Sequence, residues 1–292
     1  MRDLLRRRAA PAVLALAVTA PAGCGDGTSS AAVADDGRLD VVASPPAVLE
    51  VVERVGGEGV DATGVTPPGA DAHAAELTGD RVARVVDADL AVHVRALSPS
   101  VDEAVALREG PSVDVLEVEG ARAEDPHVWL DPVLLAEAAD AVAAGLAEAD
   151  PAGADGYERR ADELVGELEA LDEDLAARLA PCRGAVLVTA HQAFGYLADR
   201  YGLEQVALTG VDPHVEPTPA RLRDVTEQVR EAGVRTVFFD EVTSTGVAQT
   251  LADEAGVATS VLSPLEASVE PDYLTAMRAN GDALARGLVC AG

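Results

Sequence analysis

The chain has 292 residues, a length that suits one large domain or two domains of ordinary size. Hydrophobic residues make up 48% of it, which is enough for a buried core and excludes an intrinsically disordered chain. The formal net charge is −29 and every one of the 22 basic residues is an arginine. This balance argues strongly against nucleic acid as a partner, because binding to phosphates needs clustered positive charge.

The N-terminus has the pattern of a targeting segment. Four arginines within the first eight residues precede an apolar run that is too short to span a bilayer, and the triplet Ala-Gly-Cys follows. This order resembles a bacterial lipoprotein signal in which Cys24 receives the lipid, although Pro21 stands where the pattern usually has Leu. We predict a signal peptide over residues 1–24, a flexible tether over 25–37 and an extracytoplasmic body that is lipid-anchored to the cell membrane. Ordinary secretion is the alternative.

The predicted compartment indicates the redox state of the two remaining cysteines. Cys182 and Cys290 remain if Cys24 carries a lipid. In an oxidising space, two remaining cysteines often pair, so we expect a disulfide between them. Two buried free thiols are the alternative.

Short runs rich in β-branched residues alternate with helix-like stretches. This alternation predicts βαβ units and a parallel sheet. The runs lie at residues 38–44, 59–65, 88–94 and 112–118 in the first half of the chain, and at 184–190, 204–210, 235–241 and 258–263 in the second.

One long helix should separate the two halves. Leucines recur every three or four residues across 155–179, with charged residues between them, and Pro181 ends the pattern. We therefore predict an α/β fold of two lobes, each a mainly parallel β-sheet flanked by helices, joined by one long rigid α-helix. The predicted boundaries are 38–150 for the first lobe, 151–181 for the connecting helix and 182–292 for the second lobe.

Three of the five histidines fall where a ligand would bind. His73, His127 and His191 each lie in a loop just past the carboxyl end of a predicted strand, two in the first lobe and one in the second. Ligands of open parallel sheets bind beyond these strand ends. Three neutral imidazoles in one cleft would suit zinc or a similar metal ion.

Several motifs resemble the metal-binding lipoproteins of bacterial ABC importers for zinc and manganese, the cluster A-I or cluster 9 solute-binding proteins. The motifs are PPGADAH, DPHVWLDP, TAHQAFGYLADRYGL and VFFDEVTSTGVAQTLADEAGV, and the resemblance runs from about Leu39 to the C-terminus. It implies two α/β lobes around a rigid helix, with His73, His127 and His191 as metal ligands. It also implies a monomer that delivers its metal ion to an ABC permease with a cytoplasmic ATPase.

The fourth ligand is left open by a departure from the family pattern. The family often has an acidic ligand near the last strand, where Ser263 stands in VLSPLE. Water, Asp240 or Glu266 could fill the position instead. Asp240 could otherwise cap the following helix or hydrogen-bond a ligand imidazole. The residues that follow His73 also differ from the family pattern, and this chain lacks the long His-rich loop of many zinc-type members.

The residue type at the third ligand position, His191, indicates which metal ion the site prefers. Manganese-type members tend to have a carboxylate at the position of His191, so a nitrogen-rich set favours Zn²⁺ over the alternatives Mn²⁺ and Fe²⁺. We expect His93 to pack within its strand and His214 to lie outside the ligand set. Trp129 should pack beneath the loop of His127 as a structural anchor.

The leading functional hypothesis is a surface-tethered receptor that captures zinc between its lobes and carries out no chemistry. A surface adhesin or metal buffer is a second hypothesis, and genes for a permease and an ATPase beside this one would argue against it. A zinc hydrolase is a third hypothesis, because three histidines and a water form a catalytic type of ligand set. The sequence has no HExxH motif to support a hydrolase.

Overall fold

The computed structural model of the chain describes residues 37–67, 69–240, 245–267 and 271–290. The predicted signal peptide, Cys24 and all of the predicted tether except Gly37 lie outside these residues. The described part belongs to one compact unit, Gly37–Gly292. None of its described helices is long and apolar enough to cross a membrane.

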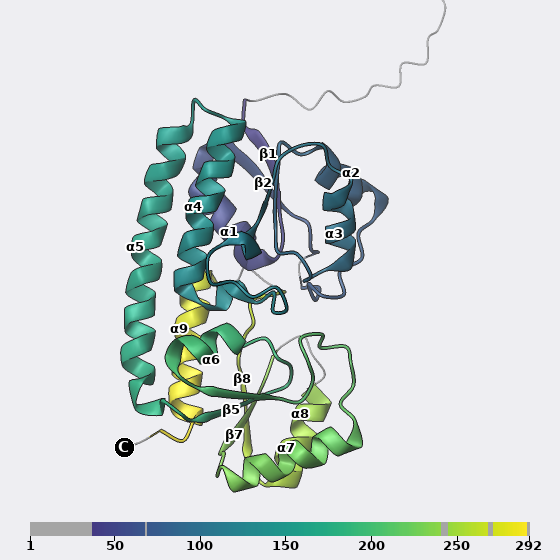
Figure 1. Ribbon diagram of the computed structural model, residues 1–292, viewed down its shortest axis with the longest axis vertical. Coiled ribbons are helices and arrows are strands. Elements are labelled where there is room, and N and C mark those ends of the chain that lie inside the picture. Colours follow the sequence, from purple (N-terminus) through teal and green to yellow (C-terminus); the bar gives the residue numbers. More distant parts are fainter. Residues whose placement is uncertain (1–36, 68, 241–244, 268–270, 291–292) are drawn as a thin grey trace, which may run out of the picture. The chain divides into compact units, whose positions relative to one another are not determined.

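The first lobe contains a parallel four-stranded sheet in the order β2-β1-β3-β4. Helices cover both of its faces (Figure 1). The strands are β1 (Leu39–Ala43), β2 (Val60–Gly64), β3 (Leu90–His93) and β4 (Ser112–Asp114), and the helices are α1 (Pro46–Gly56), α2 (Gly79–Asp87), α3 (Pro99–Ala106) and α4 (Pro132–Ala149). Val41 and Ala43 pack in the same core cluster as α1 and α4, whereas Val42 packs with α2 and α3. Both faces of β1 are therefore buried, as is usual in parallel sheets.

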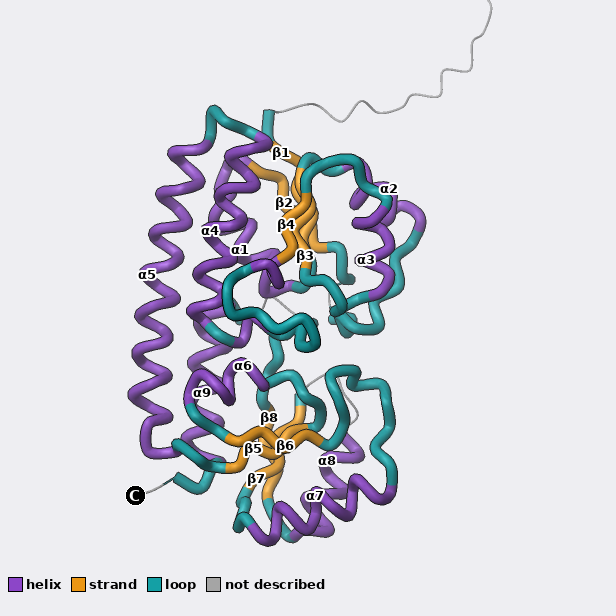
Figure 2. The backbone as a smooth tube through the Cα atoms, viewed as in Figure 1, coloured by secondary structure: helices purple, strands orange, loops and turns teal. Residues whose placement is uncertain are grey.

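The second lobe repeats this plan with the order β6-β5-β7-β8, also parallel (Figure 2). Residues of α7 and α8 share one core cluster with this sheet, and residues of α6 and α9 share the other. The strands are β5 (Val186–Thr189), β6 (Glu204–Ala207), β7 (Thr236–Phe239) and β8 (Ala258–Val261), and the helices are α6 (Gly195–Tyr201), α7 (Pro219–Glu231), α8 (Thr245–Ala255) and α9 (Tyr273–Gly287).

The long helix α5 (Ala154–Leu179) connects the two sheets (Figure 1). Its 26 residues span about 39 Å at 1.5 Å per residue. It packs against α1 and α4 beside the first sheet and against α9 beside the second. The predicted leucine stripe is buried, which explains why this amphipathic helix stays against both lobes. The stripe consists of Leu164, Leu168, Leu171, Leu175 and Leu179.

The predicted fold class is confirmed, with two local differences. The run at 112–118 is a strand only over Ser112–Asp114 and then turns into a 3₁₀ helix, because Asp114 Oδ1 accepts a hydrogen bond from the backbone N–H of Leu116 at 3.0 Å. The short helix α3 was not predicted. It follows Ser98 and has Pro99 at its first position, an ordinary start for a helix.

A disulfide and a helix cap agree with what the sequence led us to expect. Cys182 and Cys290 form a disulfide that ties the segment after α9 to the segment after α5. Asp131 caps α4 by accepting a hydrogen bond from the backbone N–H of Val133 at 2.9 Å, and Pro132 is the first residue of that helix.

Candidate metal centre

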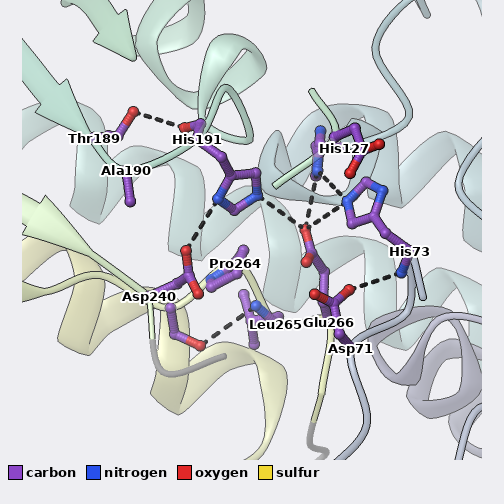
Figure 3. Close-up of polar contacts among 12 residues, drawn as sticks. Asp71, His73, His127, Thr189, Ala190, His191, Asp240, Pro264, Leu265 and Glu266 are labelled. Carbon is purple, nitrogen blue, oxygen red and sulfur yellow. Dashed lines mark hydrogen bonds and ion pairs between the residues drawn. The ribbon is translucent and has the colours of Figure 1, made fainter. Parts of the chain in front are cut away.

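Four side chains converge between the two sheets, two from each lobe (Figure 3). His73 comes from the loop after β2, and His127 from the loop between β4 and α4. His191 lies two residues after the end of β5, and Glu266 lies in the loop between β8 and α9. The carboxyl ends of the parallel strands therefore deliver all three predicted histidines, and an acidic residue with them, to one place.

The donor atoms are close enough to share one ion. Nε2 of His127 lies 3.0 Å from Oε1 of Glu266, and Nε2 of His73 and of His191 each lie 3.7 Å from the same oxygen. Nε2 of His73 is 3.2 Å from Nε2 of His127, and all four donors lie within 4.8 Å of one another. A tetrahedral zinc ion with donors at about 2.0–2.1 Å needs donor–donor spacings of about 3.3–3.4 Å. The spacings of the four donors bracket this value.

The donors are removed from solvent. The side chains of His127, His191 and Glu266 are 0–2% exposed, and that of His73 is 7% exposed. Nε2 of His191 and Oε1 of Glu266 are buried and make no hydrogen bond within the described part of the chain. Their contacts inside the cluster are the ion pairs given above, so a bound cation would satisfy both atoms at once.

Two aspartates orient the buried imidazoles from behind. Asp125 Oδ1 accepts a hydrogen bond from Nδ1 of His127 at 2.8 Å, and Asp240 Oδ2 accepts one from Nδ1 of His191 at 3.0 Å. With the proton on Nδ1, each ring presents the lone pair of Nε2 to the centre. A carboxylate behind a histidine is the usual support of a metal ligand.

The backbone on either side of the ligands is also held. Asp71 Oδ1 accepts a hydrogen bond from the backbone N–H of His73 at 2.8 Å, and Asp125 Oδ1 does the same for His127 at 3.1 Å. The loop of His73 reaches the second lobe, where the backbone N–H of Gly69 donates to the carbonyl of Ala267 at 2.8 Å. The ligand loops of the two lobes are therefore joined to each other beside the site.

The electrostatics favour charged forms in the cluster. Burial lowers the pKa of His191, but the hydrogen bond with Asp240 and the contact with Glu266 raise it more, to about 10. Burial likewise lowers the pKa of His127, but Asp125 and Glu266 raise it by more, so this pKa is higher than its ordinary value. Burial raises the pKa of Glu266, and the histidines lower it to well below its ordinary value. A divalent ion must displace the imidazole protons, since only neutral imidazole binds a metal.

The other residues considered from the sequence as possible ligands lie outside the group of four donor atoms. Asp240 supports His191 from behind, and Ser263 Oγ accepts a hydrogen bond from the backbone N–H of Leu265 at 3.3 Å. His93 lies at the end of β3 with Nδ1 3.2 Å from the carbonyl oxygen of Val113. His214 is half-exposed, with Nε2 3.2 Å from Oδ2 of Asp71. Of the three residues left open for the fourth position, the structure brings only Glu266 to the three histidine Nε2 atoms.

Asp240 was expected either as a fourth ligand or as a hydrogen-bond partner of a ligand imidazole, and it hydrogen-bonds His191. Asp71 and Asp125 were not predicted as partners of the histidines. A signal for them was present, because Asp71 and Asp125 each stand two residues before a clustered histidine in an Asp-X-His sequence. An aspartate in such a turn readily accepts a hydrogen bond from the N–H two residues later. The predicted role of Trp129 agrees with the structure. Its side chain is fully buried, and its ring centroid lies 5.5 Å from that of His127.

Comparison with known proteins agrees with this geometry. Residues 41–287 match the family described as ZnuA, zinc-uptake complex component A, periplasmic. The chain belongs to this family. The family resemblance inferred from the motifs is thereby confirmed.

Individual relatives are similar over most of the chain. The zinc-binding lipoprotein AdcA of Streptococcus pneumoniae is 32% identical over 85% of this chain, which spans 56% of the length of AdcA. The high-affinity zinc uptake system protein ZnuA of Bacillus subtilis is 30% identical over 95% of this chain and 96% of its own length. A solved structure of the laminin-binding protein Lmb of Streptococcus agalactiae, described as a bifunctional protein with adhesin and metal-transporting activity, is 30% identical with a TM-score of 0.79. That comparison covers 85% of this chain and 99% of Lmb.

Proposed function

We propose that this protein is an extracytoplasmic solute-binding protein that captures Zn²⁺ between its lobes and delivers it to an ABC permease. The observation that carries the proposal is the cage of three imidazole nitrogens and one carboxylate oxygen, all within 4.8 Å of one another. The ligands would be His73, His127, His191 and Glu266. The zinc-binding and zinc-uptake names of AdcA and ZnuA support the same cargo.

Zinc suits this donor set better than manganese does. Mn²⁺ prefers six oxygen-rich ligands, whereas Zn²⁺ accepts four ligands with several nitrogens. The spacings of 3.0–3.7 Å from Glu266 Oε1 to the three Nε2 atoms leave little room for further ligands inside the cage. We therefore assign Mn²⁺ and Fe²⁺ a much weaker affinity.

Capture without chemistry is favoured over hydrolysis. A catalytic zinc keeps one position for water or substrate, whereas four protein donors fill a tetrahedron. The buried carboxylate of Glu266 faces three histidines and would be a ligand, so it would not be free to act as a general base. Transport is thus the better account of a closed and buried cage.

The organisation of the chain supports delivery at a membrane. We propose lipidation at Cys24 with cleavage of the signal peptide directly before this residue, followed by the tether at 25–37. The lobes would occupy 38–150 and 182–292, with the connecting segment at 151–181. The helix α5 contacts elements beside both sheets, so large hinge motions are disfavoured and the metal would be exchanged by smaller movements of the ligand loops.

Zinc accumulation in the native host tests the proposal. Cells that lack the gene should accumulate less zinc under zinc limitation, and the wild-type gene should restore accumulation. The variant His191→Ala should fail, whereas the control His93→Gln should succeed, because His93 lies outside the cage. Normal zinc accumulation without the gene would contradict transport and would favour a metal buffer or an adhesin, the latter being an activity that the description of Lmb includes.

A further inference from the structure

The loop that carries Glu266 has an unusual backbone conformation. Leu265, the residue directly before Glu266, has a φ of +60°, in the left-handed region that favours glycine. A bulky side chain holds this conformation only where its surroundings impose it. The direction in which Glu266 leaves the backbone depends on this turn, so whatever fixes the turn also fixes the carboxylate.

Asn280 on α9 fixes the start of this loop. Its side chain is 3% exposed, and it bonds to both backbone groups of Ser263. Oδ1 accepts from the backbone N–H of Ser263 at 2.9 Å, and Nδ2 donates to the carbonyl oxygen of Ser263 at 2.8 Å. Ser263 Oγ in turn accepts from the backbone N–H of Leu265 at 3.3 Å. A chain of hydrogen bonds therefore runs from α9 to the left-handed residue.

Trp129 holds the same loop from the other lobe. Its Nε1 donates to the carbonyl oxygen of Pro264 at 2.7 Å, and the hydroxyl of Tyr273 donates to the carbonyl oxygen of Trp129 at 2.6 Å. Trp129 follows His127 by two residues, and Pro264 precedes Glu266 by two. The buried hydrogen bond from Trp129 to Pro264 therefore ties the loop of His127 to the loop of Glu266 and fixes the distance between these two metal ligands.

We infer that Asn280 is a positioning residue for metal selectivity, which acts by holding the Ser263–Glu266 loop so that Glu266 completes a cage of tetrahedral size. The inference rests on the proposed function, because it takes Glu266 to be a zinc ligand. Without Asn280, the backbone groups of Ser263 lose their buried partners and the turn at Leu265 loses its support. Glu266 then can retreat, and the wider and wetter site that results suits a six-coordinate ion better than it suits zinc.

Affinity and spectroscopy on the full chain test this role. Removal of a residue that orients a ligand typically costs about 10–100-fold in metal affinity, and we expect a loss of this size in zinc affinity for Asn280→Ala, measured by competition with a chromophoric chelator. Mn²⁺ affinity should fall less than zinc affinity, so the ratio of zinc affinity to manganese affinity should decrease. The visible absorption of the Co²⁺-loaded variant should weaken, as expected when a tetrahedral site gains ligands. Wild-type zinc affinity and an unchanged Co²⁺ spectrum would overturn the inference.

Two comparisons separate positioning from general destabilisation. Thr226→Ala on α7 removes another buried polar side chain, whose hydrogen bond to the carbonyl oxygen of Leu222 stays within its own helix, and it should keep wild-type zinc affinity. In a Glu266→Ala background, Asn280→Ala should change zinc affinity by no more than about twofold, since no carboxylate is left to position. A full loss in that background would overturn the inference.

A second variant guards against misfolding of the first. Asn280→Asp keeps the size of the side chain but turns an acceptor toward the carbonyl oxygen of Ser263, so it should lower zinc affinity by at least as much as Asn280→Ala does. Unchanged affinity in this variant would overturn the inference. Failure of the wild-type protein to bind zinc would overturn the proposed function and this inference together, whereas tight wild-type binding with unaffected Asn280 variants would overturn the inference alone.

Discussion

Asp240 Oδ2 lies 3.0 Å from Nδ1 of His191, on the side of the ring away from Glu266. Both side chains are 1% exposed. The hydrogen bond fixes which nitrogen carries the proton and how the ring is turned. In the proposed site it also makes Nε2 a stronger donor to the metal, so an acidic residue that does not touch the metal contributes to the affinity.

We predict that Asp240→Asn lowers zinc affinity by about 10–100-fold, because a neutral amide stabilises the Nδ1–H tautomer less than a carboxylate does. The measurement is competition with a chelator at neutral pH. Asp253→Asn is a matched control, since Asp253 is exposed on α8 and, among the residues that the structure describes, accepts only a local hydrogen bond from Gln249 at 2.8 Å. Equal affinities for both variants would show that Asp240 does not support the site.

A methyl group at Gly195 should disturb the other supporting carboxylate. A Cβ atom built there would lie 2.8 Å from Asp125 Oδ2 and 3.1 Å from the guanidinium of Arg122. The Asp125 carboxylate must then shift, which disturbs its hydrogen bond to His127, and we expect Gly195→Ala to weaken zinc binding by about tenfold. Gly166→Ala on α5 is the control, because no described atom outside its neighbouring residues and the backbone of its own helix lies within 4 Å of its Cβ position, so affinity should not change. Calorimetry on both variants decides the prediction, which fails if Gly195→Ala binds as tightly as the control.

The stability of the fold should depend on pH through an ion pair between Asp172 on α5 and Arg200 on α6. Hydrogen bonds from Arg200 lower the pKa of Asp172 more than burial raises it. A carboxyl whose pKa is lower in the folded state stabilises the fold above its unfolded pKa, near the ordinary 3.8, and this contribution is lost as pH falls through the folded pKa. Arg200 is 36% exposed, so screening by solvent limits the size of the effect.

Asp172→Asn should therefore reduce the free energy of unfolding by about 2 kcal/mol at neutral pH. The difference from wild type should shrink as the pH is lowered below about 4, because the native carboxyl then loses its charge as well. Urea unfolding of both proteins across this range measures the difference. A difference that stays constant down to low pH would mean that the charge of Asp172 is not what stabilises the fold.

The disulfide should contribute to stability without contributing to zinc binding. It joins residues 108 positions apart and lies at the ends of α5 and α9, whereas the cage lies at the strand ends. Cys182→Ser together with Cys290→Ser should lower the free energy of unfolding by about 2–5 kcal/mol. Zinc affinity at a temperature where the variant is folded should equal that of the wild type. Denaturant unfolding and chelator competition test the two halves of this prediction, and a variant as stable as the wild type would contradict the first.

Much of the fold follows from local patterns. The leucine stripe of α5 and the alternation of strands and helices predict two parallel sheets and a connecting helix, and the position of each histidine after a strand predicts that His73, His127 and His191 meet. Features that depend on single hydrogen bonds were harder to predict from these patterns. The strand predicted at 112–118 ends at Asp114, because the Asp114 side chain bonds to the N–H of Leu116, and β-branched residues beyond it gave no sign of this competition.

The fourth position shows a second limit. Sequence patterns left water, Asp240 and Glu266 open for this position, because Ser263 stands where the family often has its acidic ligand. The choice among them depends on the turn at Leu265, whose φ of +60° is not one that a leucine predicts. It depends also on long-range bonds from Asn280 and Trp129, which join segments up to 135 residues apart. Sequence patterns describe local preferences and do not reveal such bonds.

The most direct test of the central claim is a calorimetric titration of the metal-stripped protein with Zn²⁺ and, separately, with Mn²⁺. We predict one tight zinc site per chain, much weaker binding of manganese, and loss of the tight site in both His191→Ala and Glu266→Ala. Tight manganese binding, or tight zinc binding that survives both substitutions, would contradict the account of a four-donor zinc cage between the lobes.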